Sequence, residues 1–102
     1  MSNVNIIATL HVANEVKEIV KNKMKKLVVL SQAESGCIKY EFNEVGGGIP
    51  GVENTGGEFV VIETWKDLSA LEAHSTSEHF SEFINNFDES ELKITLQVIN
   101  LV

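Results

Sequence analysis

Apolar and polar side chains alternate in four separate stretches of the chain, which is the pattern of β-strands with one buried face. In the first stretch, every second residue from Ile6 to Val12 is apolar. The second stretch places Ile38, Tyr40 and Phe42 together on its buried face. The third carries apolar side chains on both faces, so both should be covered. The pattern therefore predicts strands at residues 4–12, 38–43, 59–65 and 92–98.

Two other stretches have apolar residues at the 3.6-residue spacing of amphipathic helices. The first extends from Asn14, whose side chain is expected to cap the helix, to about Ala33. Gly36 follows, as expected where a helix ends in a residue with positive φ. The second begins after the capping residue Asp67 and starts again after Ser77, a second capping residue. The apolar stripe after Ser77 consists of Phe80, Phe83, Ile84 and Phe87.

The resulting order is β-α-β-β-α-β, which predicts a ferredoxin-like α+β fold with the helices on one face of a four-stranded antiparallel sheet. The chain of 102 residues has room for one domain, residues 1–102. The opposite face of the sheet is too apolar to remain in water, so we expect a second subunit to cover it in a homodimer.

A long connection at residues 45–57 joins the second and third predicted strands along the chain. It holds six of the seven glycines and the only proline. Within it, residues 46–51 match the dinucleotide-binding pattern G-x-G-x-x-G. That pattern has to join a strand to a helix, and here it joins two strands. We therefore expect a hairpin loop and no dinucleotide site.

The formal net charge of −7 argues against a nucleic-acid partner, because such proteins need a basic surface to displace counterions. The one basic cluster, residues 17–26, alternates with apolar residues and is typical of the solvated face of a helix. A single cysteine, Cys37, excludes an internal disulfide and fits a reducing cytoplasm. No apolar run approaches the ~20 residues that span a membrane. We expect a soluble cytoplasmic protein with no membrane partner.

Three short motifs resemble those of antibiotic biosynthesis monooxygenase domains of the quinol-monooxygenase type. Residues 35–41 read S-G-C-I-K-Y-E, similar to the family's P-G-C-x-x-Y-E. Residues 63–74 resemble its E-x-W-x-D … A-L-x-x-H signature, and residues 77–80 resemble its S-x-H-F motif. The resemblance covers essentially the whole chain. It implies a dimeric α+β barrel with a pocket between sheet and helices, and oxidation of quinol-like or polyketide-like phenols by dioxygen without a metal or organic cofactor.

The chain departs from the family's pattern at two places. The connection at residues 45–57 is longer than usual, so the substrate range does not carry over. A related haem-degrading branch holds iron through a histidine on the last helix, and no histidine follows His79 here. We therefore expect no haem.

His74 is the leading candidate for catalysis, because a histidine titrates near neutral pH and can take a phenolic proton. Alternatively, it interacts with the dipole at a helix C-terminus. Glu63 is expected to orient His74 or a substrate hydroxyl, or else to be a solvated strand residue. Trp65 either stacks on a planar substrate or belongs to the core. Tyr40 and Asn5 are candidates for hydrogen bonding to a substrate.

The two histidines His74 and His79 lie five residues apart and lack the H-E-x-x-H pattern of a helical zinc site, so no metal is expected. The preferred function is a cofactor-independent monooxygenase, an oxidoreductase acting on a small electron-rich aromatic and dioxygen. Two alternatives stay open: an isomerase of a small metabolite on the same scaffold, and a non-catalytic ligand-binding or stress-related dimer.

Overall fold

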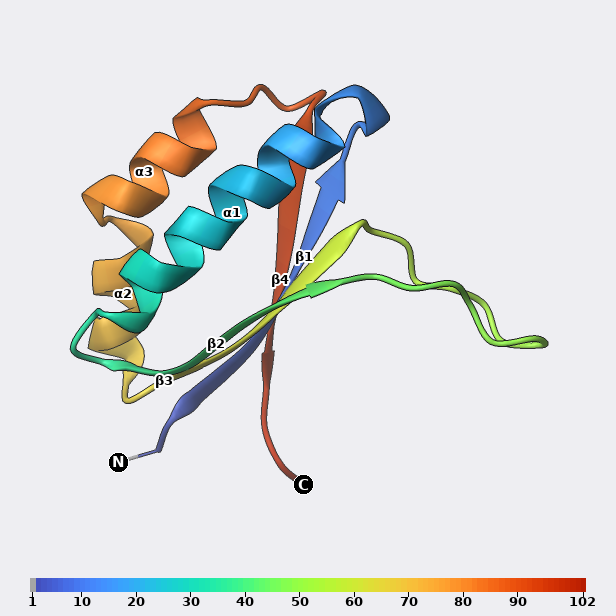
Figure 1. The fold of residues 1–102 in the computed structure, drawn as a ribbon. Coiled ribbons are helices and arrows are strands. Elements are labelled where there is room, and N and C mark those ends of the chain that lie inside the picture. The colour runs from blue at the N-terminus through green and yellow to red at the C-terminus, as the bar shows by residue number, and fades with distance from the viewer. Residues whose placement is uncertain (1) are drawn as a thin grey trace.

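The computed structural model describes residues 2–102 as a four-stranded antiparallel sheet with helices packed on one of its faces (Figure 1). The strand order is β2-β3-β1-β4. This confirms the predicted ferredoxin-like α+β arrangement. The elements are β1 (Val4–Val12), a 3-10 turn η1 (Asn14–Val16), α1 (Lys17–Gln32), β2 (Cys37–Glu44), β3 (Phe59–Trp65), α2 (Leu68–Ser75), α3 (Glu78–Asn85) and β4 (Leu92–Ile99).

The core lies between the helices and the helix-facing side of the sheet. On that side, Ile6 of β1 lies opposite Glu63 of β3, and Leu10 lies opposite Phe59. The alternation in β1 and β3 is thus confirmed, since the inward side chains of both strands are buried. The largest fully buried side chains are Trp65, Phe59, Ile6, Leu10, Met24, Val20 and Val61.

The register of β2 differs from a simple alternation at its start. The pairing with β3 shifts between Cys37 and Lys39, so one residue is left over on β2. As a result Ile38 turns outward and is 57% exposed, while Tyr40 is buried. The prediction that Ile38 shares the buried face of Tyr40 was therefore wrong, because a bulge changes the parity of the strand.

The start of α1 also differs from the prediction, because Asn14 does not cap the helix. Asn14 lies inside the 3-10 turn, and no side-chain hydrogen bond caps either the turn or α1. The tight turn, closed by a hydrogen bond from the Val16 amide to the Ala13 carbonyl (3.1 Å), places Val16 in the core. Burial of Val16, rather than a polar cap, thus accompanies the start of this helix.

Gly36 is needed for close packing and not for a positive φ. Among residues 2–102, positive φ occurs only at Gly51, Gly56 and Gly57. A Cβ added to Gly36 would lie 2.2 Å from the Cβ of Ala70 in α2. The glycine therefore lets the turn before β2 approach α2, which carries His74.

Two predicted helix caps are confirmed. The Asp67 side chain accepts a hydrogen bond from the Ala70 amide (2.9 Å) at the start of α2. Ser77 accepts from the Phe80 amide (3.3 Å) at the start of α3. Because α2 ends at Ser75, the chain makes a sharp break between two short helices.

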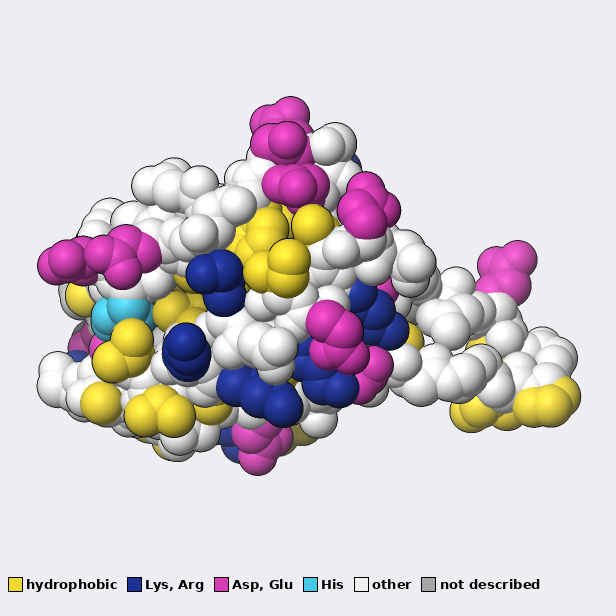
Figure 2. Space-filling model, turned by 45° about the horizontal axis from the view of Figure 1, so that its top comes forward, with side chains coloured by type: hydrophobic (Ala, Val, Ile, Leu, Met, Phe, Trp, Pro, Cys, Tyr) yellow, Lys and Arg dark blue, Asp and Glu magenta, His cyan; other side chains and the backbone are white. Residues whose placement is uncertain are grey.

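The connection between β2 and β3 projects from the body as a narrow arm (Figure 1). Apolar side chains sit at its far end in the space-filling view, and Ile49 and Val52 of this segment are exposed (Figure 2). The same view shows lysines gathered on one face, as expected for a solvated helix surface. Two lysines of α1, Lys17 and Lys21, form ion pairs with Glu44. Within residues 2–102, no helix is long and apolar enough to cross a membrane.

Candidate functional site

A small apolar cavity of about 70 Å³ lies between the helices and the sheet. Its walls come from β1, β2, β3, β4 and all three helices. Most of the lining is aliphatic or aromatic, including Phe80 and Phe83. The lining residues with polar side chains are Tyr40, Glu63, His74 and Ser75. Such a cavity keeps water away from the few polar groups that face it.

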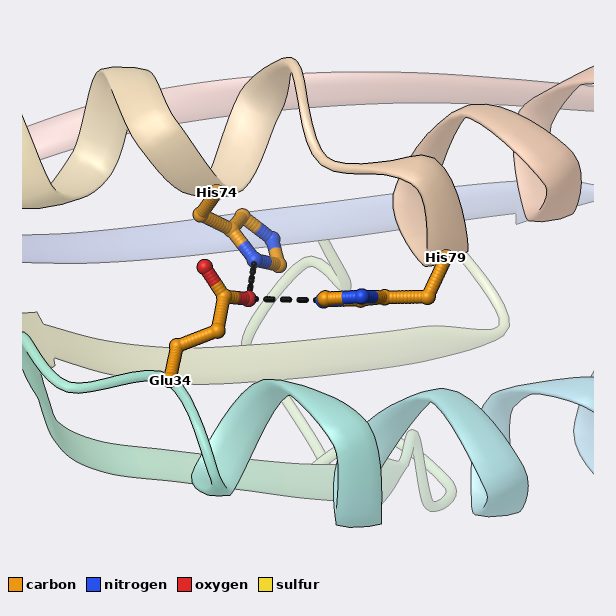
Figure 3. A group of neighbouring side chains, drawn as sticks. All are labelled: Glu34, His74 and His79. Atoms are coloured by element: carbon orange, nitrogen blue, oxygen red, sulfur yellow. Dashed lines mark hydrogen bonds and ion pairs between the residues drawn. The ribbon is translucent and has the colours of Figure 1, made fainter.

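His74 is buried at the edge of this cavity, in the last turn of α2. Its Nδ1 lies 2.7 Å from Oε2 of Glu34 (Figure 3). A carboxylate accepts hydrogen bonds, so Nδ1 carries the hydrogen and Nε2 keeps its lone pair. Within residues 2–102, the hydrogen bonds of this ring involve Nδ1 alone. Nε2 is therefore the ring atom left to accept a proton from a bound molecule.

Glu34 comes from the turn after α1 and was not among the predicted site residues. The same oxygen, Oε2, also lies 2.8 Å from Nε2 of His79, at the start of α3 (Figure 3). Glu34 is 40 positions from His74 in sequence, and no local pattern links them. The only feature of the sequence that could have pointed to Glu34 is its position directly before the S-G-C motif.

Aromatic rings surround the His74 imidazole. The ring centroids of Trp65, Phe80 and Tyr40 lie 4.6, 5.0 and 5.4 Å from that of His74. Burial lowers the pKa of His74, and the hydrogen bond and charge of Glu34 act in the opposite direction. Burial therefore favours the neutral imidazole, which is the form that accepts a proton.

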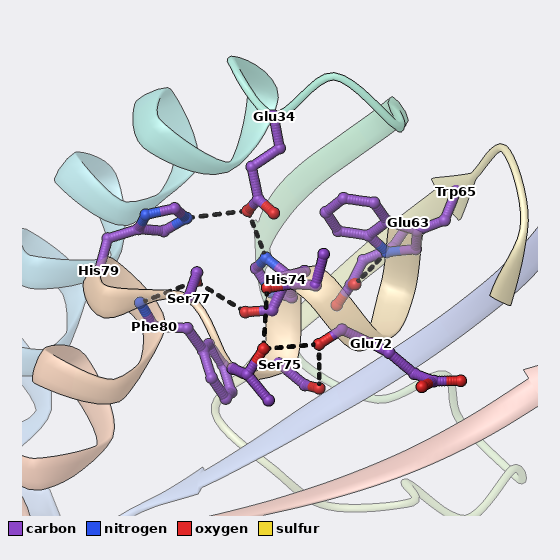
Figure 4. A network of polar contacts seen from close by, with 11 residues as sticks. Glu34, Glu63, Trp65, Glu72, His74, Ser75, Ser77, His79 and Phe80 are labelled. Atoms are coloured by element: carbon purple, nitrogen blue, oxygen red, sulfur yellow. Dashed lines mark hydrogen bonds and ion pairs between the residues drawn. The ribbon is translucent and has the colours of Figure 1, made fainter. Parts of the chain in front are cut away.

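Glu63 faces the cavity but does not orient His74. Its Oε1 accepts a hydrogen bond from Nε1 of Trp65 at 2.8 Å (Figure 4). Burial raises the pKa of Glu63 to about 7, with the Trp65 hydrogen bond opposing the rise and the charge of Glu34 adding to it. Glu34, and not the predicted Glu63, is thus the carboxylate that orients His74. The alternative that Glu63 is a solvated strand residue is excluded, because Glu63 is buried.

Two residues that were predicted to contact a substrate, Trp65 and Asn5, do not line the cavity. Trp65 is fully buried behind His74 and is not part of the cavity wall, so it belongs to the core. Asn5 lies on the opposite face of the sheet, where its side chain accepts a hydrogen bond from Thr64 at 2.9 Å. Tyr40 does line the cavity, and burial raises the pKa of its hydroxyl, so it stays a hydrogen-bond donor.

Cys37 lies at the start of β2, and burial raises the pKa of its thiol. This effect disfavours the reactive thiolate. The thiol is not part of the cavity wall.

Comparisons with known proteins agree with this architecture. The family described as "Antibiotic biosynthesis monooxygenase" matches residues 3–86. A Bacillus subtilis protein named "Putative monooxygenase YcnE" is 36% identical over 78 residues, which cover 76% of this chain and 74% of that protein.

Solved structures give the same result. PA3566 from Pseudomonas aeruginosa has a TM-score of 0.80 and 27% identity, covering 100% of this chain and 96% of that one. A structure titled as an antibiotic biosynthesis monooxygenase has a TM-score of 0.77 and 25% identity, covering 97% and 98% of the two chains. The chain therefore belongs to the antibiotic biosynthesis monooxygenase family, and its general function is monooxygenase-like.

Proposed function

We propose that this protein oxidises a small electron-rich aromatic, a quinol or polyketide-like phenol, with dioxygen and without a metal or organic cofactor. The observation that carries the proposal is the pairing of His74 with Glu34. One ring nitrogen of His74 is held by the Glu34 carboxylate, and the ring belongs to the wall of an apolar cavity. An oriented base of this kind is the arrangement that activates hydroxyl groups in many enzymes.

In the proposed reaction, Nε2 of His74 takes the phenolic proton, and the Glu34 carboxylate stabilises the imidazolium that forms. The resulting phenolate is electron-rich enough to react with dioxygen at a ring carbon. One oxygen atom stays on that carbon as a carbonyl, and the carbon loses its hydrogen. The other oxygen leaves as water with that hydrogen and the proton returned by His74. A phenol plus dioxygen thus gives a quinone plus water, so no external reductant is needed.

Tyr40 and Glu63 complete the polar side of the cavity in this proposal. The two residues lie opposite each other on β2 and β3, and both line the cavity. The raised pKa of Glu63 gives a large protonated fraction at neutral pH, so both groups donate hydrogen bonds to a substrate oxygen. The apolar remainder excludes water while the reactive anion is present.

The size of the cavity favours a second candidate, a non-catalytic, stress-related dimer whose pocket no longer holds a ligand. About 70 Å³ is well below the roughly 300 Å³ at the lower end of typical ligand sites. Binding of an aromatic ring therefore requires lining side chains such as Phe80 to move. An isomerase would use the same residues, and oxygen dependence distinguishes it from a monooxygenase.

We also propose that the protein is a homodimer. The sheet face opposite the helices carries partly exposed apolar side chains, among them Ile7, Ile62 and Ile99. A second copy of the same sheet would cover them. Light scattering after gel filtration tests this, and a monomer at micromolar concentration would contradict it.

The proposed activity is tested by incubating the protein with a panel of hydroquinones and naphthols, with and without oxygen. With ¹⁸O₂ we expect one labelled atom in the product, and no product anaerobically. His74→Ala should lower turnover by roughly 10²- to 10⁴-fold. His11→Ala is the matched control, because His11 lies in β1 and hydrogen bonds to Thr95 away from the cavity. Undiminished turnover by His74→Ala contradicts the proposal, and so does a product formed equally well without oxygen.

A further inference from the structure

Three metal-ligating side chains converge beside the cavity. The ligand atoms of Glu34, His74 and His79 all lie within 4.8 Å of one another. They come from the turn after α1, the last turn of α2 and the first turn of α3 (Figure 3). We propose that these three residues form a binding site for a divalent first-row transition-metal cation such as Zn²⁺.

The break between α2 and α3 is what brings the two histidines together. In a continuous helix, residues five apart point about 140° away from each other, which would separate His74 from His79. Here Ser77 donates a hydrogen bond to the His74 carbonyl (2.7 Å) and caps α3 (Figure 4). One side chain therefore fixes the end of one helix and the start of the next. Both imidazoles turn toward Glu34, and the donor set is organised before any ion binds.

The donor set is typical of zinc and not of magnesium or calcium. Two imidazole nitrogens and one carboxylate oxygen are the protein ligands of many three-ligand zinc sites, which leave a fourth position open. Magnesium and calcium prefer oxygen ligands alone. Ligands at about 2.0–2.2 Å from a tetrahedral ion lie about 3.3–3.6 Å apart. The present nitrogen–oxygen distances of 2.7 and 2.8 Å therefore need to open by about 0.5–0.9 Å, and the two histidine nitrogens already lie within 4.8 Å of each other.

The cluster is also accessible to an ion. The side chains of Glu34 and His79 are 16% and 22% exposed, whereas that of His74 is 5% exposed. An ion can thus enter from the Glu34 and His79 side and reach Nδ1 of His74 without crossing the cavity. The net charge of −7 favours the approach of cations over anions.

Binding of a cation changes the state of His74. The cation takes the lone pair of Nδ1, and the hydrogen that Nδ1 carried moves to Nε2. His79 likewise coordinates through Nε2 and carries its hydrogen on Nδ1. With zinc bound, Nε2 carries a hydrogen and can no longer accept the substrate proton. Zinc therefore inhibits turnover. This consequence rests on the proposed function, whereas binding itself does not.

Isothermal titration calorimetry of the chelator-treated, dialysed protein with ZnCl₂ tests the site directly, without substrate. We expect one Zn²⁺ per chain and, with MgCl₂, an affinity at least about 100-fold weaker. His79→Gln and Glu34→Gln should each weaken Zn²⁺ binding by at least about tenfold. His11→Gln removes the only other histidine of the chain, and Cys37→Ser removes its only thiol. Both variants should bind Zn²⁺ with unchanged affinity.

Far-UV circular dichroism confirms that each variant is folded, which is expected for His79→Gln because that side chain is partly exposed. Visible absorption of the Co²⁺-loaded protein should show the intense bands of a four-coordinate site and lose them in His79→Gln. Absence of Zn²⁺ binding by the unaltered protein overturns the proposal. Binding that persists in both cluster variants but is lost in a control variant also overturns it. A protein that binds Zn²⁺ but oxidises no phenol supports this site and contradicts only the proposed function.

Discussion

Replacing Glu63 with glutamine should remove a pH dependence of stability that the native protein owes to one buried carboxyl group. Glu63 is 5% exposed and accepts a hydrogen bond from the Trp65 indole. Tyr40 faces it across β2 and β3, and His74 shares the cavity wall with it. Glu34 is the charged group that contributes to its pKa shift. Glutamine keeps the size and the acceptor oxygen but cannot ionise.

The magnitude follows from the pKa of Glu63, which burial raises from 4.5 to about 7. The folded state then binds the proton more tightly than the unfolded state. Stability from this group is therefore fully present below pH 4.5 and is lost as the pH rises through about 7. A difference of about 2.5 pKa units at about 1.36 kcal/mol per unit sets the loss at about 3 kcal/mol.

Urea unfolding at pH 5, 6, 7 and 8 measures this loss. We expect the free energy of unfolding of the native protein, relative to that of Glu63→Gln, to fall by about 2–3 kcal/mol from pH 5 to pH 8. Glu41→Gln is the matched control, since Glu41 is an exposed glutamate on β2, and its curve should run parallel to that of the native protein. Parallel curves for Glu63→Gln and the native protein would refute the reasoning.

Three further substitutions test the packing and the site. Gly36→Ala places a Cβ 2.2 Å from that of Ala70 and should cost about 1–3 kcal/mol of unfolding free energy. Adding Ala70→Gly should recover part of this loss. If the losses of the two single variants simply add up in the double variant, the clash between the two Cβ atoms is contradicted. Ser77→Ala should cost about 1 kcal/mol through the lost cap of α3, whereas Ser81→Ala, exposed on the same helix, should change the free energy by less than about 0.5 kcal/mol. Glu34→Gln should lower turnover on a phenol by at least about tenfold while leaving unfolding cooperative, and unchanged turnover would remove Glu34 from the proposed mechanism.

The fold was predictable because its signals are local. Alternation and helical spacing identify each element within a few residues, and capping residues such as Asp67 and Ser77 mark where helices begin. The errors arose where packing overrides local preference. Val16 enters the core through a 3-10 turn without help from Asn14, and a bulge turns Ile38 outward. Neither event leaves a signature in the order of apolar and polar residues.

The candidate site was only partly predictable, because alternation gives the face of a side chain but not its neighbours. His74, Glu63 and Tyr40 do line one cavity. Trp65 lies on the predicted face yet behind the cavity, and its depth depends on how the helices pack. Glu34 escaped prediction because the contact that makes it important joins segments 40 residues apart.

The central claim is that Glu34 holds the hydrogen of His74 on Nδ1 and leaves Nε2 free to accept a proton. Nitrogen-15 NMR of the metal-free, histidine-labelled protein at neutral pH distinguishes the two tautomers of each ring directly. The structure predicts that His74 is neutral, with a protonated Nδ1 and an unprotonated Nε2. A spectrum that shows the hydrogen on Nε2 instead would contradict the account.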